Sequence, residues 1–251
     1  MGLDLLIRDG TVVDGSGMPR YRADVGAESG RIVEIGRIRT PAERTIDASG
    51  LIVAPGFIDD HTHMDAQVAW NPLGSCSCWH GVTSVVTGNC GFALAPCRPG
   101  DREWFARCLT AVEDIPTESM MAGSDWTWET FPEYLATVER LPKAINYGIY
   151  IGHSALRMYV MGRRGLEDRA SEEDLHRVAA VVGEAMRAGA MGPVDLARDD
   201  PRHARRVSGC QPRSRLGGDR LARRCYGGTR CRDLSDRSRY LRRRGATCVS
   251  R

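Results

Sequence analysis

Residues 56–63 begin with the apolar segment Gly56 to Ile58 and end in two histidines, His61 and His63. Side chains on a β-strand alternate between the two faces, so residues two positions apart point in the same direction. A strand over this run therefore directs both imidazoles toward one point, where they could bind one metal ion. The alternative is a pair of histidines with ordinary hydrogen bonds at a strand end, and the pair alone leaves both open.

The chain after Pro55 alternates strands with segments of helical length. The apolar and β-branched content predicts strands at residues 57–63, 82–87 and 145–152. Strands that alternate with helices indicate βαβ units and a parallel sheet. We therefore predict an α/β fold over residues 56–192.

The clearest helical pattern begins at Ser171. Asp174 stands three residues later, which is the spacing of a capping box, and Gly189 ends the pattern. The apolar positions of one helical face are Leu175, Val178, Ala179, Val182 and Met186.

Residues 1–55 have the pattern of short strands joined by turns. Asp9 and Gly10 separate two apolar runs, which predicts a hairpin. Residues 31–35 alternate with a period of two, which predicts a half-buried strand. We expect a small β-rich layer over residues 1–55.

The composition changes at Gly192. Residues 193–251 contain 17 Arg, no Lys and 6 Asp, a charge of +11, so the chain's net +3 leaves −8 for residues 1–192. Because few apolar side chains offset the entropy of ordering, we expect residues 193–251 to be disordered or to arise from a reading-frame shift.

Several classes of protein are disfavoured by the composition. The chain begins without the basic and apolar segments of a secretion signal, and it has no apolar run of about 18 residues, so we expect no membrane association. Its nine cysteines have no framework spacing, which favours the reducing cytoplasm.

Cys90 adds a third candidate metal ligand. It lies in a glycine-containing turn, residues 88–91, directly after the strand predicted at 82–87. Active sites of (β/α)₈ barrels lie at the carboxyl ends of the strands, so the thiol could join His61 and His63. Two imidazoles and a thiolate suit zinc. The alternative is a small buried residue in a tight turn.

These motifs resemble the amidohydrolase superfamily, and within it the D-aminoacylase (N-acyl-D-amino-acid deacylase) branch. The resemblance rests on residues 56–63, 80–91, 152–157 and 188–192, and covers residues 1 to about 192. It implies that residues 56–192 are the first half of a TIM-type metal-dependent hydrolase barrel, preceded in residues 1–55 by part of a β-sandwich.

The resemblance also implies a metal site and a reaction. His61 and His63 would bind one zinc ion, and Cys90 would bridge to a second. The substrate would be an N-acyl-D-amino acid, whose linear amide C–N bond is hydrolysed by metal-activated water. Two further histidine ligands and a catalytic aspartate have no counterpart here. We therefore assign no catalytic base, and expect an incomplete second metal site and a truncated chain that is inactive alone.

Two residues are weaker candidates for substrate binding. His153 follows the strand predicted at 145–152, and Asp65 lies two residues past His63. For each, the alternative is a structural role.

Two other functions stay open at this stage. One is hydrolysis of a cyclic amide or imide by the same metal chemistry. The other is a non-catalytic fragment whose basic segment, residues 193–251, binds nucleic acid. We do not expect nucleic acid as a partner, because this segment offers only Tyr226 and Tyr240 for stacking on bases.

Overall fold

The computed structural model describes residues 2–113 and 115–194. The expectation for the basic segment therefore lies, from residue 195 on, outside the described residues. The chain divides into two compact units, the first ending at Phe57 and the second beginning at Ile58. Each unit is described by itself below.

The first unit is built on a five-stranded sheet with the order β3-β2-β1-β4, in which β5 also pairs with β1. The strands are β1 (Leu3–Val12), β2 (Tyr21–Glu28), β3 (Arg31–Gly36), β4 (Ala42–Asp47) and β5 (Ile52–Val53). The β1–β2 and β2–β3 pairs are antiparallel, whereas β4 and β5 run parallel to β1. Leu3, Leu6 and Ile38 form its small core.

The hairpin predicted at Asp9 and Gly10 is wrong. β1 continues through both residues, and its register with β2 shifts between Ile7 and Gly10, which is a β-bulge. Asp9 has a φ of 58°. An Asp-Gly pair tolerates the positive φ that tight turns and bulges both require, so the dipeptide alone cannot distinguish them. β1 is continuous because its residues before Asp9 pair with β4 and its residues after Gly10 pair with β5.

The strand predicted at residues 31–35 is confirmed as β3, but it is exposed and not half-buried. Ile32 is 60% exposed and Ile35 is 48% exposed. β3 is the edge strand of its sheet, with β2 as its neighbour.

The second unit contains a three-stranded sheet with the order β6-β7-β8. The strands predicted at 57–63 and 82–87 are confirmed as β6 (Phe57–Thr62) and β7 (Val82–Thr87), and β7 runs parallel to β8 (Asn146–Ile149). The strand predicted at 145–152 is divided at Tyr150, after which β9 (Ile151–Gly152) pairs in parallel with β10 (Pro193–Val194). Strand structure thus continues two residues past Gly192.

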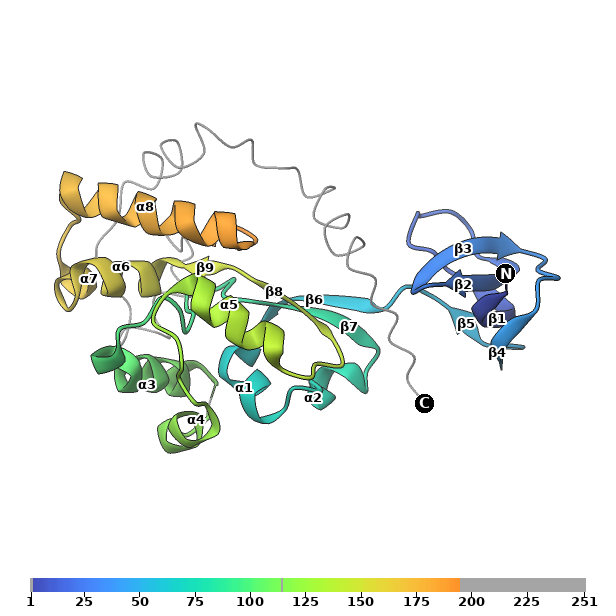
Figure 1. The fold of residues 1–251 in the computed structure, drawn as a ribbon, viewed down its shortest axis with the longest axis horizontal. Helices are drawn as coiled ribbons and strands as arrows, with labels where there is room; N and C mark the ends of the chain where they lie inside the picture. Colours follow the sequence, from blue (N-terminus) through green and yellow to red (C-terminus); the bar gives the residue numbers. More distant parts are fainter. Residues whose placement is uncertain (1, 114, 195–251) are drawn as a thin grey trace. The chain divides into compact units, whose positions relative to one another are not determined.

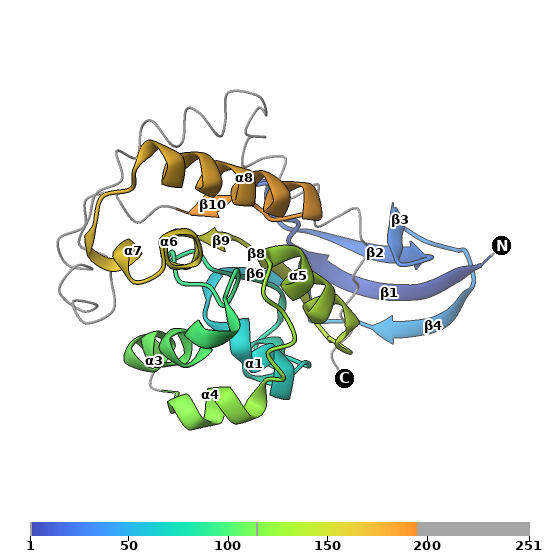
Figure 2. The ribbon, with the colours of Figure 1, turned by 60° about the vertical axis from the view of Figure 1, so that its left-hand side comes forward.

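Helices pack beside this sheet, while most residues of β6 are exposed (Figures 1 and 2). The helices are α1 (Met64–Trp70), α2 (Ser75–Cys78), α3 (Arg102–Glu113), α4 (Thr117–Gly123), α5 (Phe131–Arg140), α6 (His153–Met161), α7 (Arg164–Glu167) and α8 (Glu172–Ala188), with a short 3₁₀ turn at Pro99–Asp101. α8 packs against α5 and α6, while α4 packs against α1 and α3. The fold is therefore mixed α/β, as expected, and the half barrel predicted for residues 56–192 stays a prediction. Within the described residues, no helix has the length and apolar character needed to cross a membrane.

Helix α8 confirms the predicted cap. The Ser171 hydroxyl accepts a hydrogen bond from the Asp174 amide at 3.1 Å, and the Asp174 carboxylate accepts one from the Ser171 amide at 3.0 Å. Hydrogen bonds from Ser171 and the nearby Arg164 guanidinium lower the pKa of Asp174.

The buried face of α8 differs from the predicted one at its end. Val178, Val182 and Ala185 are buried, whereas Met186 is 39% exposed. At 100° per residue, Ala185 lies closer than Met186 to the line through Val178.

Candidate metal centre

Three side chains predicted as metal ligands come together in the second unit. His61 lies in β6, and His63 follows this strand as the residue before helix α1. Cys90 lies in the turn after β7, the strand next to β6. The ligand atoms of the three residues all lie within 4.8 Å of one another. The two imidazole rings have centroids 5.7 Å apart and are tilted by 49°.

The turn at residues 88–91 places the Cys90 sulfur. The Gly91 amide donates to the Gly88 carbonyl at 3.1 Å, and both glycines have positive φ, +79° and +83°. A Cβ on Gly88 would lie 2.6 Å from the carbonyl oxygen of Tyr150, so the backbone approaches that residue too closely for a side chain. In this turn, Cys90 Sγ lies 3.3 Å from His63 Nε2.

His63 is neutral at physiological pH. Burial of the ring, reinforced by the nearby His61, lowers the pKa of His63 to about 4. A neutral imidazole keeps a lone pair on one ring nitrogen, which is the form that binds metals.

One pair of the three ligand atoms has the spacing expected on a tetrahedral metal ion, and all three lie within 4.8 Å. Nitrogen and sulfur ligands bind zinc at about 2.0–2.3 Å, so two ligands of one tetrahedral ion lie about 3.5 Å apart. The 3.3 Å between Cys90 Sγ and His63 Nε2 is close to that separation. His61 is exposed, so the cluster has one side open to a small molecule.

Asp65 does not belong to this cluster. It lies on α1, is 1% exposed, and lines a small cavity of about 100 Å³ together with Val68, Ser124 and Trp128. Its predicted contact with substrate stays a prediction.

His153 is the first residue of α6, and its ring is not one of the three clustered groups either. The helix start nevertheless meets the Cys90 turn, because the Ser154 amide donates to the Gly91 carbonyl at 3.2 Å. A substrate contact by His153 also stays a prediction.

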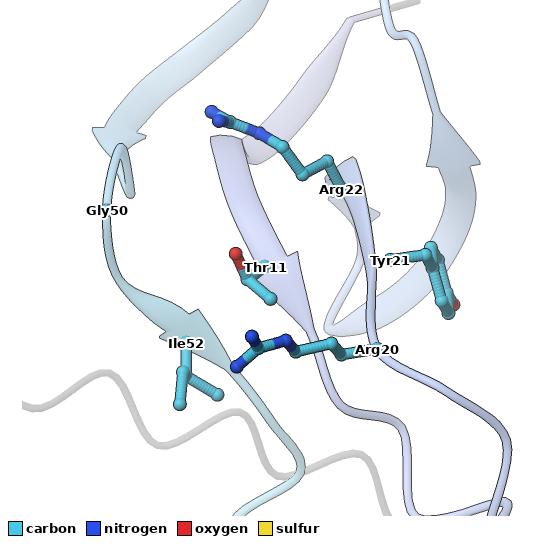
Figure 3. Close-up of a pocket in the computed structure, with 6 residues that line it drawn as sticks. All are labelled: Thr11, Arg20, Tyr21, Arg22, Gly50 and Ile52. Carbon is cyan, nitrogen blue, oxygen red and sulfur yellow. The ribbon is translucent and has the colours of Figure 1, made fainter.

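A larger open cavity, of about 420 Å³, lies in the first unit (Figure 3). It is lined by Thr11, Arg20, Tyr21, Arg22, Gly50 and Ile52. None of these offers an imidazole, thiolate or carboxylate, so this cavity is no alternative metal centre.

Two polar side chains beside the cluster were given no role from the sequence. The Asn89 amide donates to the Asp60 carbonyl at 3.0 Å, and the Thr62 hydroxyl donates to the Val86 carbonyl at 3.2 Å. Both join the β6 segment to the β7 segment. The position of Asn89 directly before Cys90 could have suggested a role for it. Its hydrogen-bond partner, Asp60, lies 29 residues away and could not be recognised from the sequence.

Comparison with known proteins identifies the class of this chain. The model of the amidohydrolase family matches residues 44–207, and the chain belongs to this family. The range matched by the family model extends past residue 192, whereas the resemblance based on the sequence motifs ends at about that residue.

The predicted branch is confirmed by individual relatives. The chain is 37% identical over 221 residues to D-aminoacylase from Alcaligenes xylosoxydans xylosoxydans, which covers 86% of this chain and 43% of that protein. It is 38% identical over 192 residues to N-acyl-D-glutamate deacylase from the same organism, covering 76% and 36%. The chain thus spans less than half the length of these relatives.

A solved structure supports the same relationship. N-acyl-D-glutamate deacylase from Bordetella bronchiseptica, in complex with zinc and a phosphonate inhibitor that mimics the tetrahedral intermediate, matches with a TM-score of 0.66 at 33% identity. The match covers 78% of this chain and 39% of that one.

Proposed function

We propose that this chain carries the zinc-binding part of an amidohydrolase that cleaves the linear amide bond of N-acyl-D-amino acids. The observation that carries the proposal is the convergence of His61, His63 and Cys90 within 4.8 Å, in a chain of the amidohydrolase family. Relatives of this chain are a D-aminoacylase and an N-acyl-D-glutamate deacylase, which supports the substrate class.

Each of the three residues would contribute one ligand to the metal. His61 and His63 would provide neutral nitrogen ligands from the end of β6, and Cys90 would provide a thiolate that offsets part of the cation's charge. When bound, zinc polarises an amide carbonyl and lowers the pKa of a bound water to about 7. The exposed His61 side of the cluster is where an acyl group would approach.

Proton transfer is not assigned to any described residue. The cluster contains two imidazoles and a thiol, and no carboxylate among the described residues joins it. We therefore propose that His61, His63 and Cys90 together hold one zinc ion, which would activate the amide carbonyl. A second metal ion is not assigned.

The test combines metal content with substrate binding by the full chain. Wild type, Cys90→Ala and His63→Ala are loaded with zinc, desalted and subjected to elemental analysis, with Cys76→Ala as a control for loss of an exposed thiol. We expect wild type and Cys76→Ala to retain zinc, and the two cluster variants to lose it.

Because no described residue is assigned the proton transfer, the substrate class is tested by binding: N-acetyl-D-glutamate, its L-enantiomer and a 5-substituted hydantoin are each titrated into the zinc-loaded chain in a calorimeter. Preference for the D-acyl substrate supports the proposal. Zinc-free wild type refutes the metal site, and preference for the hydantoin favours the cyclic amide alternative.

A further inference from the structure

The turn that carries Cys90 is held from two sides. On one side the Asn89 side chain donates to the Asp60 carbonyl at 3.0 Å, and on the other the Ser154 amide donates to the Gly91 carbonyl at 3.2 Å. Cys90 lies between these two anchors. The first anchor lies next to the histidine ligands, because Asp60 directly precedes His61 in β6.

The turn itself supplies one backbone hydrogen bond, and its other close contacts come from distant segments, with Gly88 against the Tyr150 carbonyl and Gly91 against Gly152. Gly88 and Gly91 both have positive φ, and the hydrogen bond between them is local to the turn. Glycine loses more conformational freedom on folding than other residues, so a turn with two glycines needs outside contacts to fix one conformation. A side-chain bond from this turn to β6 supplies such a contact.

The Asn89 bond is not the usual role of asparagine in a turn. Asparagine commonly bonds to the backbone two residues further along the chain. Here its amide instead reaches a carbonyl 29 residues earlier, in the strand that carries His61. The bond therefore adds a link between two ligand-bearing segments, next to the Cys90 turn and in addition to the β6–β7 pairing and the Thr62 hydroxyl bond.

We propose that Asn89 is a positioning residue that holds the Cys90 sulfur at metal-binding distance from His61 and His63. The proposal rests on the metal site proposed above. Metal–sulfur bonds vary by only a few tenths of an ångström, so displacement of this turn by about 1 Å would remove the thiolate from the coordination sphere. Loss of a residue that orients a ligand typically weakens metal binding about 10–100-fold.

Asn146 offers a matched control. Its side-chain amide also crosses between neighbouring strands, donating from β8 to the Thr83 carbonyl at 3.1 Å. Thr83 lies near the start of β7, whereas the Cys90 turn follows the end of that strand. The same amide also donates to the Ser84 hydroxyl at 3.3 Å, so its removal costs two bonds of this kind at the opposite end of the strand.

The experiment titrates cadmium alone into the full chain and records the cadmium–thiolate charge-transfer band. Wild type, Asn89→Ala, Asn89→Gln, Asn146→Ala and Cys90→Ser are compared, and circular dichroism reports the folded fraction of each. We expect wild type and Asn146→Ala to show the band with equal affinity. Asn89→Ala should bind at least about tenfold more weakly, and Asn89→Gln, which keeps an amide donor, should recover part of the loss.

The outcomes separate this inference from the metal site itself. If Asn89→Ala matches wild type in band and affinity while Cys90→Ser loses the band, the metal site stands and the role of Asn89 is refuted. If Asn146→Ala loses affinity as much as Asn89→Ala, the effect is general destabilisation and the role is again refuted. If wild type shows no thiolate band, both proposals fail.

Discussion

Gly152 is packed so closely against the Cys90 turn that a single added methyl group tests the arrangement. Gly152 has an ordinary extended backbone, with a φ of −78° and a ψ of 137°, so alanine brings no backbone strain. Its Cβ would lie 2.4 Å from the Gly91 carbonyl oxygen, about 1 Å closer than the 3.4 Å at which ordinary contacts begin.

The expected cost follows from what must move. Overpacking a well-packed site costs about 1–3 kcal/mol. Displacing the Gly91 carbonyl also weakens the hydrogen bond from the Ser154 amide, worth about 1 kcal/mol. We therefore expect Gly152→Ala to lower the free energy of unfolding by about 3 kcal/mol. Because the turn must shift, cadmium should also bind more weakly through Cys90.

Gly100→Ala is the control in the same unit, since no atom lies within 4 Å of the position of its added Cβ. It should be neutral, or more stable by about 0.4–1 kcal/mol through reduced entropy of the unfolded chain. Urea denaturation followed by circular dichroism measures both variants. If Gly152→Ala unfolds at the same urea concentration as Gly100→Ala, the close packing of β9 against the Cys90 turn is refuted.

Three further predictions concern other parts of the second unit. Ser171→Ala should cost about 1 kcal/mol in urea denaturation because α8 loses its cap, and a change below the error of the fit contradicts this. Tyr134→Phe should cost about 1–2 kcal/mol in the same assay, since the buried Tyr134 hydroxyl donates to the Asp65 carbonyl at 2.9 Å; unchanged stability contradicts it. Burial raises the pKa of the Cys97 thiol to about 12. The stability that this neutral, buried thiol contributes is therefore present below pH 9 and is lost as the pH rises toward 12. At pH 8, iodoacetamide should therefore modify exposed Cys76 well before Cys97, as mass spectrometry of the peptides can show.

The features that the sequence predicted well are those encoded within a few residues. β7 follows from a β-branched run, and α8 from a cap, a periodic apolar face and a final glycine. The convergence of His61 and His63 follows from the geometry of an extended segment, and the position of Cys90 from its place after the next strand.

The features that the sequence did not predict depend on residues distant in the chain. Asp9 and Gly10 form a bulge and not a hairpin because β4 and β5 pair with the continuous strand. The exposure of β3 depends on its place at the sheet edge. The bond from Asn89 to Asp60 requires the two strands to be neighbours, which no local pattern specifies.

The most direct test of the account is X-ray absorption spectroscopy at the zinc edge of the zinc-loaded full chain. The account predicts a shell of nitrogen or oxygen ligands at about 2.0 Å together with one sulfur at about 2.3 Å. The sulfur shell should disappear in Cys90→Ser, and the nitrogen shell should shrink in His61→Ala. A wild-type spectrum without sulfur, or a sulfur shell that persists in Cys90→Ser, would contradict a metal centre built from His61, His63 and Cys90.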